Sequence, residues 1–285
     1  MTTMRPCAVE TAFGTIAGLR TGEAGAPRVL ALHGWLDNAA SFLPLSQHLR
    51  GIDLVAIDLP GHGASTHLPL PADYLLITFA RAAFAAADAL GWERFALLGH
   101  SLGGVVASVM ASAQPQRIER LLTIEALGAL AEKEERTTQR LRDAFDAHRK
   151  LADKQLRVFP DVAAAARARM QAGTGALGEA AALLLVERGL RKVDGGFAWR
   201  SDPRLTMPTA VRMSEAQSRD LVANIECRTR VIYADPPQSY FPDALRRERA
   251  AMLRNGELVV LPGSHHLHMD DAAGTAAAIG DFFVA

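Results

Sequence analysis

A serine between two glycines is the feature of this chain that most directly suggests chemistry. Residues 99–103 are Gly-His-Ser-Leu-Gly, placed between an apolar run that ends at Leu98 and an Ala/Val-rich stretch of helical composition that stops at Pro115. If a strand turns sharply into a helix here, a side chain at either glycine would collide with neighbouring backbone. The turn would expose the Ser101 hydroxyl and direct the first N–H groups of the helix toward it. Ser101 is therefore predicted to be a nucleophile that attacks a carbonyl carbon.

A serine nucleophile needs a base to take its proton and a carboxylate to orient that base. Two adjacent histidines near the C-terminus, His265 and His266, are the candidates for the base. Two carboxylates are candidates for the acid, because Glu125 and Asp235 each come directly after an apolar run. The residues alone leave both choices open, and every combination gives the chain order serine, acid, histidine.

The elements that must position these residues alternate between short apolar runs and helical segments. This alternation predicts a mostly parallel, doubly wound sheet with helices on both faces, where functional side chains gather at the carboxyl ends of the strands. A hairpin around Phe13-Gly14 is expected to precede the parallel strands. The expected strands lie at residues 29–32, 53–57, 95–98, 121–124, 230–233 and 258–261.

The alternation fails once, in a charged and Ala-rich segment without a clear strand. We interpret residues 128–213 as a helical cap, or lid, inserted after the sixth strand. The core domain then consists of residues 1–127 and 214–285. His148 recurs at helical spacing with its apolar neighbours, so it is interpreted as a helix-face residue and not as a ligand.

Composition excludes several classes of partner. The 285 residues are 49% hydrophobic and carry a formal net charge of +0, so no basic field is available for nucleic acid or an anionic membrane. Cys7 and Cys227 lie far apart, which is typical of a reducing compartment and gives no disulfide framework. We expect a soluble cytoplasmic protein whose partner is a small molecule. The oligomeric state cannot be derived from the sequence.

One rival motif would imply a metal. Residues 266–271, His-Leu-His-Met-Asp-Asp, nearly match the His-x-His-x-Asp-His run of dinuclear metallohydrolases. The final histidine is missing, and only 14 residues remain after Asp271 to supply further ligands. We therefore predict no metal and no cofactor.

Four ordered motifs resemble the α/β-hydrolase fold family over essentially the whole chain. They are HGW at 33–35, DLPGHGAS at 58–65, GHSLGG at 99–104 and PGSHHLHMD at 262–270. Within that family, IEALG at 124–128 and the HHLHMD ending are most similar to serine hydrolase-like proteins.

The resemblance implies a role for each matching residue. Ser101 corresponds to the nucleophile, and counting back five residues from Asp270 makes His265 the base, with His266 as the alternative. The oxyanion hole would be formed by the backbone N–H groups of Leu102 and Trp35.

The acid departs from the family's usual arrangement. Most members place an aspartate three residues beyond the glycine that follows the penultimate strand, but Pro237 stands three residues beyond Ala234 in this chain. Asp235 comes two residues too early. Some branches of the family use the position of Glu125, whose longer side chain helps it reach. We expect Glu125 to be the acid and keep Asp235 as the alternative.

A serine rather than an aspartate at residue 101 favours acyl transfer over alkyl-enzyme chemistry. The expected activity is hydrolysis of an ester, thioester or lactone of a small apolar substrate through an acyl-serine intermediate. Phe42 and Leu127 are expected to face the substrate pocket together with Trp35 and Leu102. Two alternatives remain, because fold does not determine function. They are a small-molecule receptor with a slow or vestigial triad, and a cofactor-free perhydrolase or lyase.

Overall fold

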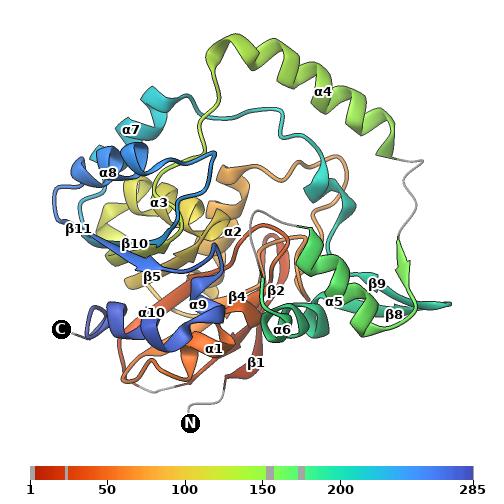
Figure 1. Cartoon of the computed structure of the whole chain (residues 1–285), viewed down its shortest axis with the longest axis horizontal. Coiled ribbons are helices and arrows are strands. Elements are labelled where there is room, and N and C mark those ends of the chain that lie inside the picture. The colour runs from red at the N-terminus through yellow and green to blue at the C-terminus, as the bar shows by residue number, and fades with distance from the viewer. Residues whose placement is uncertain (1–3, 23–24, 152–156, 173–176, 285) are drawn as a thin grey trace.

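An eight-stranded sheet forms the centre of the computed structural model of this chain (Figure 1). Its strand order is β1-β2-β4-β3-β5-β6-β10-β11, with parallel pairing from β4 through to β11 and antiparallel pairing of β1 with β2 and of β2 with β4. The fold predicted from the sequence is confirmed. The strands are β1 (Arg5–Thr11), β2 (Gly14–Arg20), β3 (Arg28–Leu32), β4 (Asp53–Ile57), β5 (Phe95–His100), β6 (Ile118–Ile124), β10 (Arg228–Asp235) and β11 (Gly256–Pro262).

The structure describes all but a few short stretches of the chain. Residues 152–156 and 173–176, which belong to the predicted cap, lie outside the described residues. Within the described part, no helix is both long and apolar enough to cross a lipid bilayer. The described residues are 4–22, 25–151, 157–172 and 177–284.

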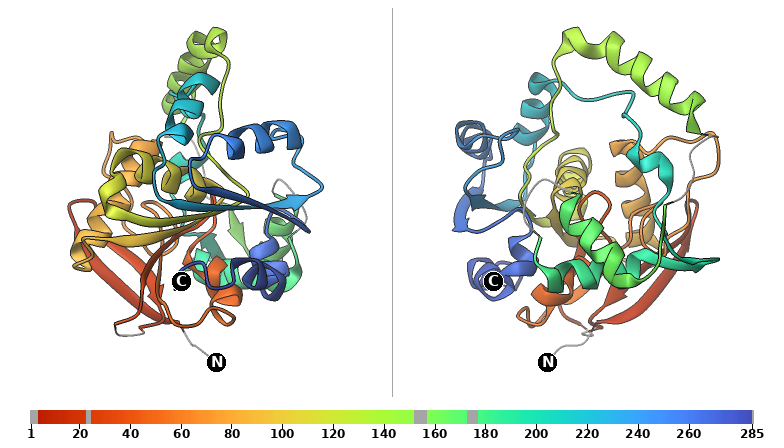
Figure 2. Two further views of the ribbon diagram at one scale, coloured as in Figure 1. Left: turned by 90° about the vertical axis from the view of Figure 1, so that its left-hand side faces the viewer. Right: turned by 45° about the vertical axis from the view of Figure 1, so that its right-hand side comes forward.

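Helices cover both faces of the sheet because its central strands are apolar on both sides (Figure 2). Leu30 and Leu32 of β3 enter one hydrophobic cluster together with residues of α2 and α3, whereas Val29 and Ala31 enter the opposite cluster with residues of α1 and α10. This alternation follows from the two-residue period of a strand. The helices of the core are α1 (Leu43–Ser46), α2 (Leu76–Ala89), α3 (Leu102–Ala113), α7 (Glu215–Ala223), α8 (Asp243–Ala251), α9 (Leu267–Asp270) and α10 (Ala272–Ile279).

The segment inserted after β6 is not purely helical, so the expectation that it lacks strands is wrong. It contains a three-stranded antiparallel sheet in the order β7-β9-β8. An Asp-Gly turn at 194–195 connects β8 to β9, with Gly195 at φ 81°. The strands are too short for their alternation to stand out from the flanking Ala-rich helices. The elements are α4 (Thr137–Arg149), β7 (Val158–Phe159), α5 (Val162–Gln171), α6 (Glu179–Gly189), β8 (Leu190–Val193) and β9 (Gly196–Trp199).

The insertion is tied to the core at its base. The Glu132 N–H donates to the Met213 carbonyl, so the two ends of the insertion lie side by side. Arg188 of α6 donates to the buried carboxylate of Asp58, which follows β4, at 2.7 Å. Breaking such a pair leaves a buried charge without a partner, which is strongly destabilising. The α5–α6 half is thus anchored on the core, whereas α4 stands away from the sheet (Figure 1).

Candidate active site

Ser101 occupies the sharp turn between β5 and α3. Its backbone has φ 50° and ψ −116°, a strained conformation for a residue other than glycine. The neighbouring glycines are required because the chain is crowded there. A Cβ at Gly99 would lie 2.5 Å from the Gly103 carbonyl oxygen, and a Cβ at Gly103 would lie 1.9 Å from that of Leu32. The strand-to-helix turn predicted from the sequence is therefore present.

His265, in the loop after β11, lies between Ser101 and Glu125. Its Nε2 is 2.9 Å from Ser101 Oγ, and its Nδ1 is 3.0 Å from Glu125 Oε2. A carboxylate can only accept, so the Nδ1–H of a neutral His265 ring donates to Glu125. The Nε2 lone pair is then free to accept the serine proton. The structure therefore brings Ser101, His265 and Glu125 together in one hydrogen-bonded row.

His266, the alternative base, turns away from Ser101. Its Nε2 lies 3.4 Å from the carboxylate of Asp37 instead. Ser264 stabilises the loop that separates the two histidines, because its Oγ accepts from the His266 N–H and donates to Asp270. The structure therefore brings only the first of the two histidines to the serine.

Glu125 is held rigidly directly after β6. Its backbone has φ 59°, and its side chain is buried. Oε1 accepts from the Ala234 N–H at 2.6 Å, which leaves Oε2 for His265. Asp235, the alternative acid, is exposed at the end of β10. Among the described residues, the Asp235 side chain makes no hydrogen bond to His265, whose Nδ1 is already occupied by Glu125.

Arg246 of α8 is a charged partner of Glu125 that sequence reasoning missed. Its Nη2 lies 3.5 Å from Glu125 Oε2, and its side chain is buried. It also donates to the carbonyls of Ala234 and Phe241, at 2.7 and 2.9 Å. The Arg246 guanidinium offsets the buried charge of Glu125. Its helix is rich in exposed charges, so no local signal distinguishes Arg246 from its neighbours.

Replacement of Glu125 by glutamine is expected to lower kcat by about 10³- to 10⁴-fold, because the amide neither fixes the His265 tautomer nor stabilises the imidazolium. The matched substitution Asp235→Asn should cost less than about tenfold, since the Asp235 side chain is exposed and Glu125 is the partner of His265 Nδ1. Ester turnover of the two variants, with circular dichroism to check folding, measures the difference. The opposite ranking would transfer the role to Asp235.

The two backbone N–H groups that we expect to bind an oxyanion belong to Leu102 and Trp35. Leu102 begins α3 directly after Ser101, and Trp35 lies in the loop after β3. Among the described residues, neither amide donates to a protein acceptor. The Trp35 indole N–H donates to the Leu205 carbonyl at 2.9 Å, so the insertion holds this loop in place.

A cavity of about 110 Å³ lies beside the nucleophile turn. Phe42 and Leu127, which we expected to face the pocket, do not line it, because both are fully buried in the hydrophobic clusters. His148 of α4 does line it, and its Nε2 lies 3.1 Å from Asp73, so its interpretation as a helix-face residue was incomplete. The apolar lining comes from Trp35, Leu75, Leu76, Phe79, Leu102, Leu205, Met207, Pro208 and Ala210.

Two further histidines of the motifs have structural roles. His33 accepts from the Leu59 N–H and donates to the Gly34 carbonyl, and both neighbouring loops are thereby joined. Burial lowers the pKa of His33, and burial lowers the pKa of His62 to about 3. Both rings therefore stay neutral near pH 7 and neither lies beside Ser101.

Known proteins resemble this chain over nearly its full length. A family model for the alpha/beta hydrolase fold matches residues 27–194. The serine hydrolase-like protein of Danio rerio is 27% identical, covering 99% of this chain and 90% of its own. Serine hydrolase-like protein 2 of Homo sapiens is 29% identical, covering 95% and 91%. The similarity to serine hydrolase-like proteins expected from the motifs is confirmed.

Solved structures also resemble this chain over nearly its full length. The crystal structure of a hypothetical protein from Pseudomonas aeruginosa PAO1 has a TM-score of 0.90 and 39% identity, with 96% of each chain covered. A thioesterase domain from the curacin biosynthetic pathway has a TM-score of 0.83 and 28% identity, covering 97% of this chain and 99% of that one.

Proposed function

Because this chain belongs to the alpha/beta hydrolase fold family, we propose that it hydrolyses an ester, thioester or lactone with Ser101 as nucleophile, His265 as base and Glu125 as acid. The observation that carries the proposal is the continuous hydrogen-bonded row from Glu125 through His265 to Ser101, with distances of 3.0 and 2.9 Å. Such a row is the arrangement by which a histidine activates a serine.

The proposed reaction has two halves. As Ser101 Oγ attacks the carbonyl carbon, its proton passes to His265 Nε2, and the oxyanion accepts hydrogen bonds from the N–H groups of Trp35 and Leu102. The leaving alcohol or thiol takes that proton from Nε2 as the carbonyl re-forms and the acyl-serine appears. In the second half His265 Nε2 takes a proton from water as the water oxygen attacks the acyl carbon. The bond from the acyl carbon to Ser101 Oγ then breaks, Nε2 returns the proton to Oγ, and the carboxylic acid leaves.

The cavity supports a small acyl group. An apolar cavity of about 150 Å³ is large enough to bind benzene. The cavity of about 110 Å³ beside Leu102 and Trp35 therefore fits a chain of only a few carbon atoms. Thioesters belong in the proposed substrate class because of the similarity to a thioesterase domain.

Esters of graded acyl length test this function. We expect p-nitrophenyl acetate and butyrate to be cleaved with kcat/KM at least tenfold above that for the decanoate, because the longer chain has no buried surface to occupy. The measurement is release of p-nitrophenolate, with and without hydrogen peroxide.

Each other outcome points to a different function. Slow labelling of Ser101 by a fluorophosphonate, without turnover of any ester, would favour a small-molecule receptor. A large gain with peroxide would favour a perhydrolase. A preference for the decanoate would show that the cavity is not the acyl site.

A further inference from the structure

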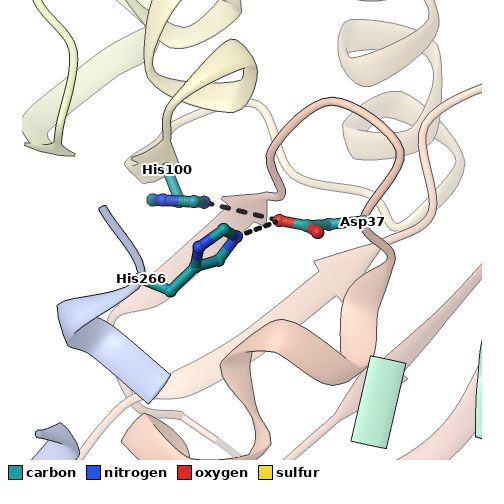
Figure 3. A group of neighbouring side chains, drawn as sticks. All are labelled: Asp37, His100 and His266. Carbon is teal, nitrogen blue, oxygen red and sulfur yellow. Dashed lines mark ion pairs between the residues drawn. The ribbon is translucent and has the colours of Figure 1, made fainter. Parts of the chain in front are cut away.

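A buried carboxylate lies directly behind the proposed triad and has no role in the reaction described above. Asp37 belongs to the loop that also carries Trp35, and it is 2% exposed. Its Oδ2 faces the rings of His100 and His266, at 3.7 Å from Nδ1 and 3.4 Å from Nε2 respectively (Figure 3). These two histidines are the chain neighbours of Ser101 and His265. One carboxylate thus contacts residues adjacent to both the nucleophile and the base.

His100 joins the nucleophile turn to the loop of the base. Its Nε2 lies 2.8 Å from the His265 carbonyl oxygen. A carbonyl only accepts, so Nε2–H is the donor and the backbone of His265 is fixed from behind. The missing side chain of Gly34 makes the approach of His100 and Asp37 possible, since a Cβ there would lie 2.8 Å from Asp37 Oδ2 and 2.9 Å from His100 Nδ1.

Asp37 also connects this region to the insertion. Its Oδ1 accepts from Arg169 Nη2 of α5 at 2.5 Å. Burial by itself would raise the pKa of Asp37, but the hydrogen bond with His266 and the positive charge of Arg169 hold it well below its usual value. Burial and the neighbouring histidines lower the pKa of His100 well below its usual value. The cluster is therefore an anionic Asp37 balanced by Arg169 beside a neutral His100.

The same side chains could be mistaken for metal ligands. One ligating atom each from Asp37, His100 and His266 lies within 4.8 Å of the other two. The separations of 3.4 and 3.7 Å from Asp37 Oδ2 are close to the spacing of about 3.3 Å between ligands of tetrahedral zinc. The charges decide against a divalent cation. Arg169 already neutralises Asp37, so the ion would bring two unbalanced positive charges into a buried site.

We propose that Asp37 is a positioning residue. It fixes His265 through the adjacent His266 and fixes Ser101 through the adjacent His100. Through Arg169 it also links both residues to the insertion. The proposal rests on the proposed function, because it assigns the geometry of that same triad. A misplacement of about 1 Å at a reacting group can cost about 100-fold in rate.

The substitution Asp37→Asn tests the proposal, because it keeps the shape of the side chain and removes its charge. We expect kcat for p-nitrophenyl acetate to fall about 10- to 100-fold while KM stays within threefold. The matched control is Asp58→Asn, which removes another buried carboxylate paired with an arginine of the insertion. This control should lower the melting temperature similarly but keep kcat within threefold of wild type at a temperature where both variants are folded.

The pH profile gives a readout that loosening of the fold would not produce. Glu125 and Arg246 face His265 from one side, and Asp37 with Arg169 lies beyond His100 and His266 on the other. Loss of the anion in Asp37→Asn makes positive charge near the triad less favourable, so the pH at half-maximal kcat should fall. Arg169→Gln should raise the pH at half-maximal kcat. We expect both variants to shift this pH by a few tenths of a unit to about one unit.

Three results would overturn the proposal. They are wild-type kcat in Asp37→Asn, equal losses of kcat in Asp37→Asn and Asp58→Asn, and a loss of wild-type activity on dialysis against EDTA that zinc restores. If Ser101→Ala is inactive while Asp37→Asn behaves like wild type, the positioning role alone fails. If Ser101→Ala is active, the proposed function fails first.

Discussion

Replacement of Ser101 by alanine is expected to remove ester hydrolysis almost completely, with a loss of kcat on the order of 10⁴- to 10⁶-fold. The substitution deletes the only atom that can form the acyl-enzyme in the proposed reaction. What remains is the contribution of binding and of the two oxyanion N–H groups. The fold should survive, because alanine fills less space and meets the same backbone strain at φ 50° as the serine it replaces.

The measurement is kcat for p-nitrophenyl butyrate, with the melting temperature as a check on folding. Ser112→Ala is the matched control, because Ser112 lies in the same helix without a contact to His265 or Glu125. It should keep wild-type kcat. Activity of Ser101→Ala within tenfold of wild type would mean that the turn carries no nucleophile.

Removal of the His265 side chain is expected to match the loss caused by Ser101→Ala, because the two groups act as one unit. Without Nε2 at 2.9 Å from Oγ, nothing takes the serine proton. His266→Ala should cost at most about 100-fold, since the His266 side chain pairs with Asp37 and makes no hydrogen bond to Ser101 among the described residues.

The double variant of Ser101 and His265 sharpens this prediction. When two groups act in the same step, the rate losses caused by replacing each of them are not additive. The double variant should therefore be no slower than Ser101→Ala alone. Further loss in the double variant would show that His265 acts outside the serine step. A larger loss in His266→Ala than in His265→Ala would reassign the base.

The predictable parts of this protein are those that backbone geometry dictates. Gly99 and Gly103 predicted a sharp strand-to-helix turn because the crowded backbone there leaves no room for a Cβ atom. Such a turn exposes the hydroxyl of the intervening serine. The parallel strands were equally predictable, since strands buried on both faces give continuous apolar runs. The contact of Glu125 with the histidine was expected from the resemblance to family branches that place the acid there, while position in the sequence alone left Asp235 open.

The parts that could not be predicted depend on contacts between distant segments. Phe42 was expected to face the substrate pocket, but the short helical turn that contains it directs the ring into the core. Arg246 and Asp37 lie among ordinary surface-type residues in the sequence, and only tertiary packing buries them beside Glu125 and His266. Neither the hydrophobic periodicity of the sequence nor the spacing of its motifs indicates such a contact.

The account depends most directly on whether Ser101 is an activated nucleophile. Intact-protein mass spectrometry after treatment with a fluorophosphonate tests this, followed by peptide mapping of the adduct. We predict one adduct per chain, on the peptide that contains Ser101, forming at least 10³-fold more slowly in His265→Ala because the hydroxyl is then no longer activated. An adduct on another residue, or equal labelling rates in wild type and His265→Ala, would contradict the account.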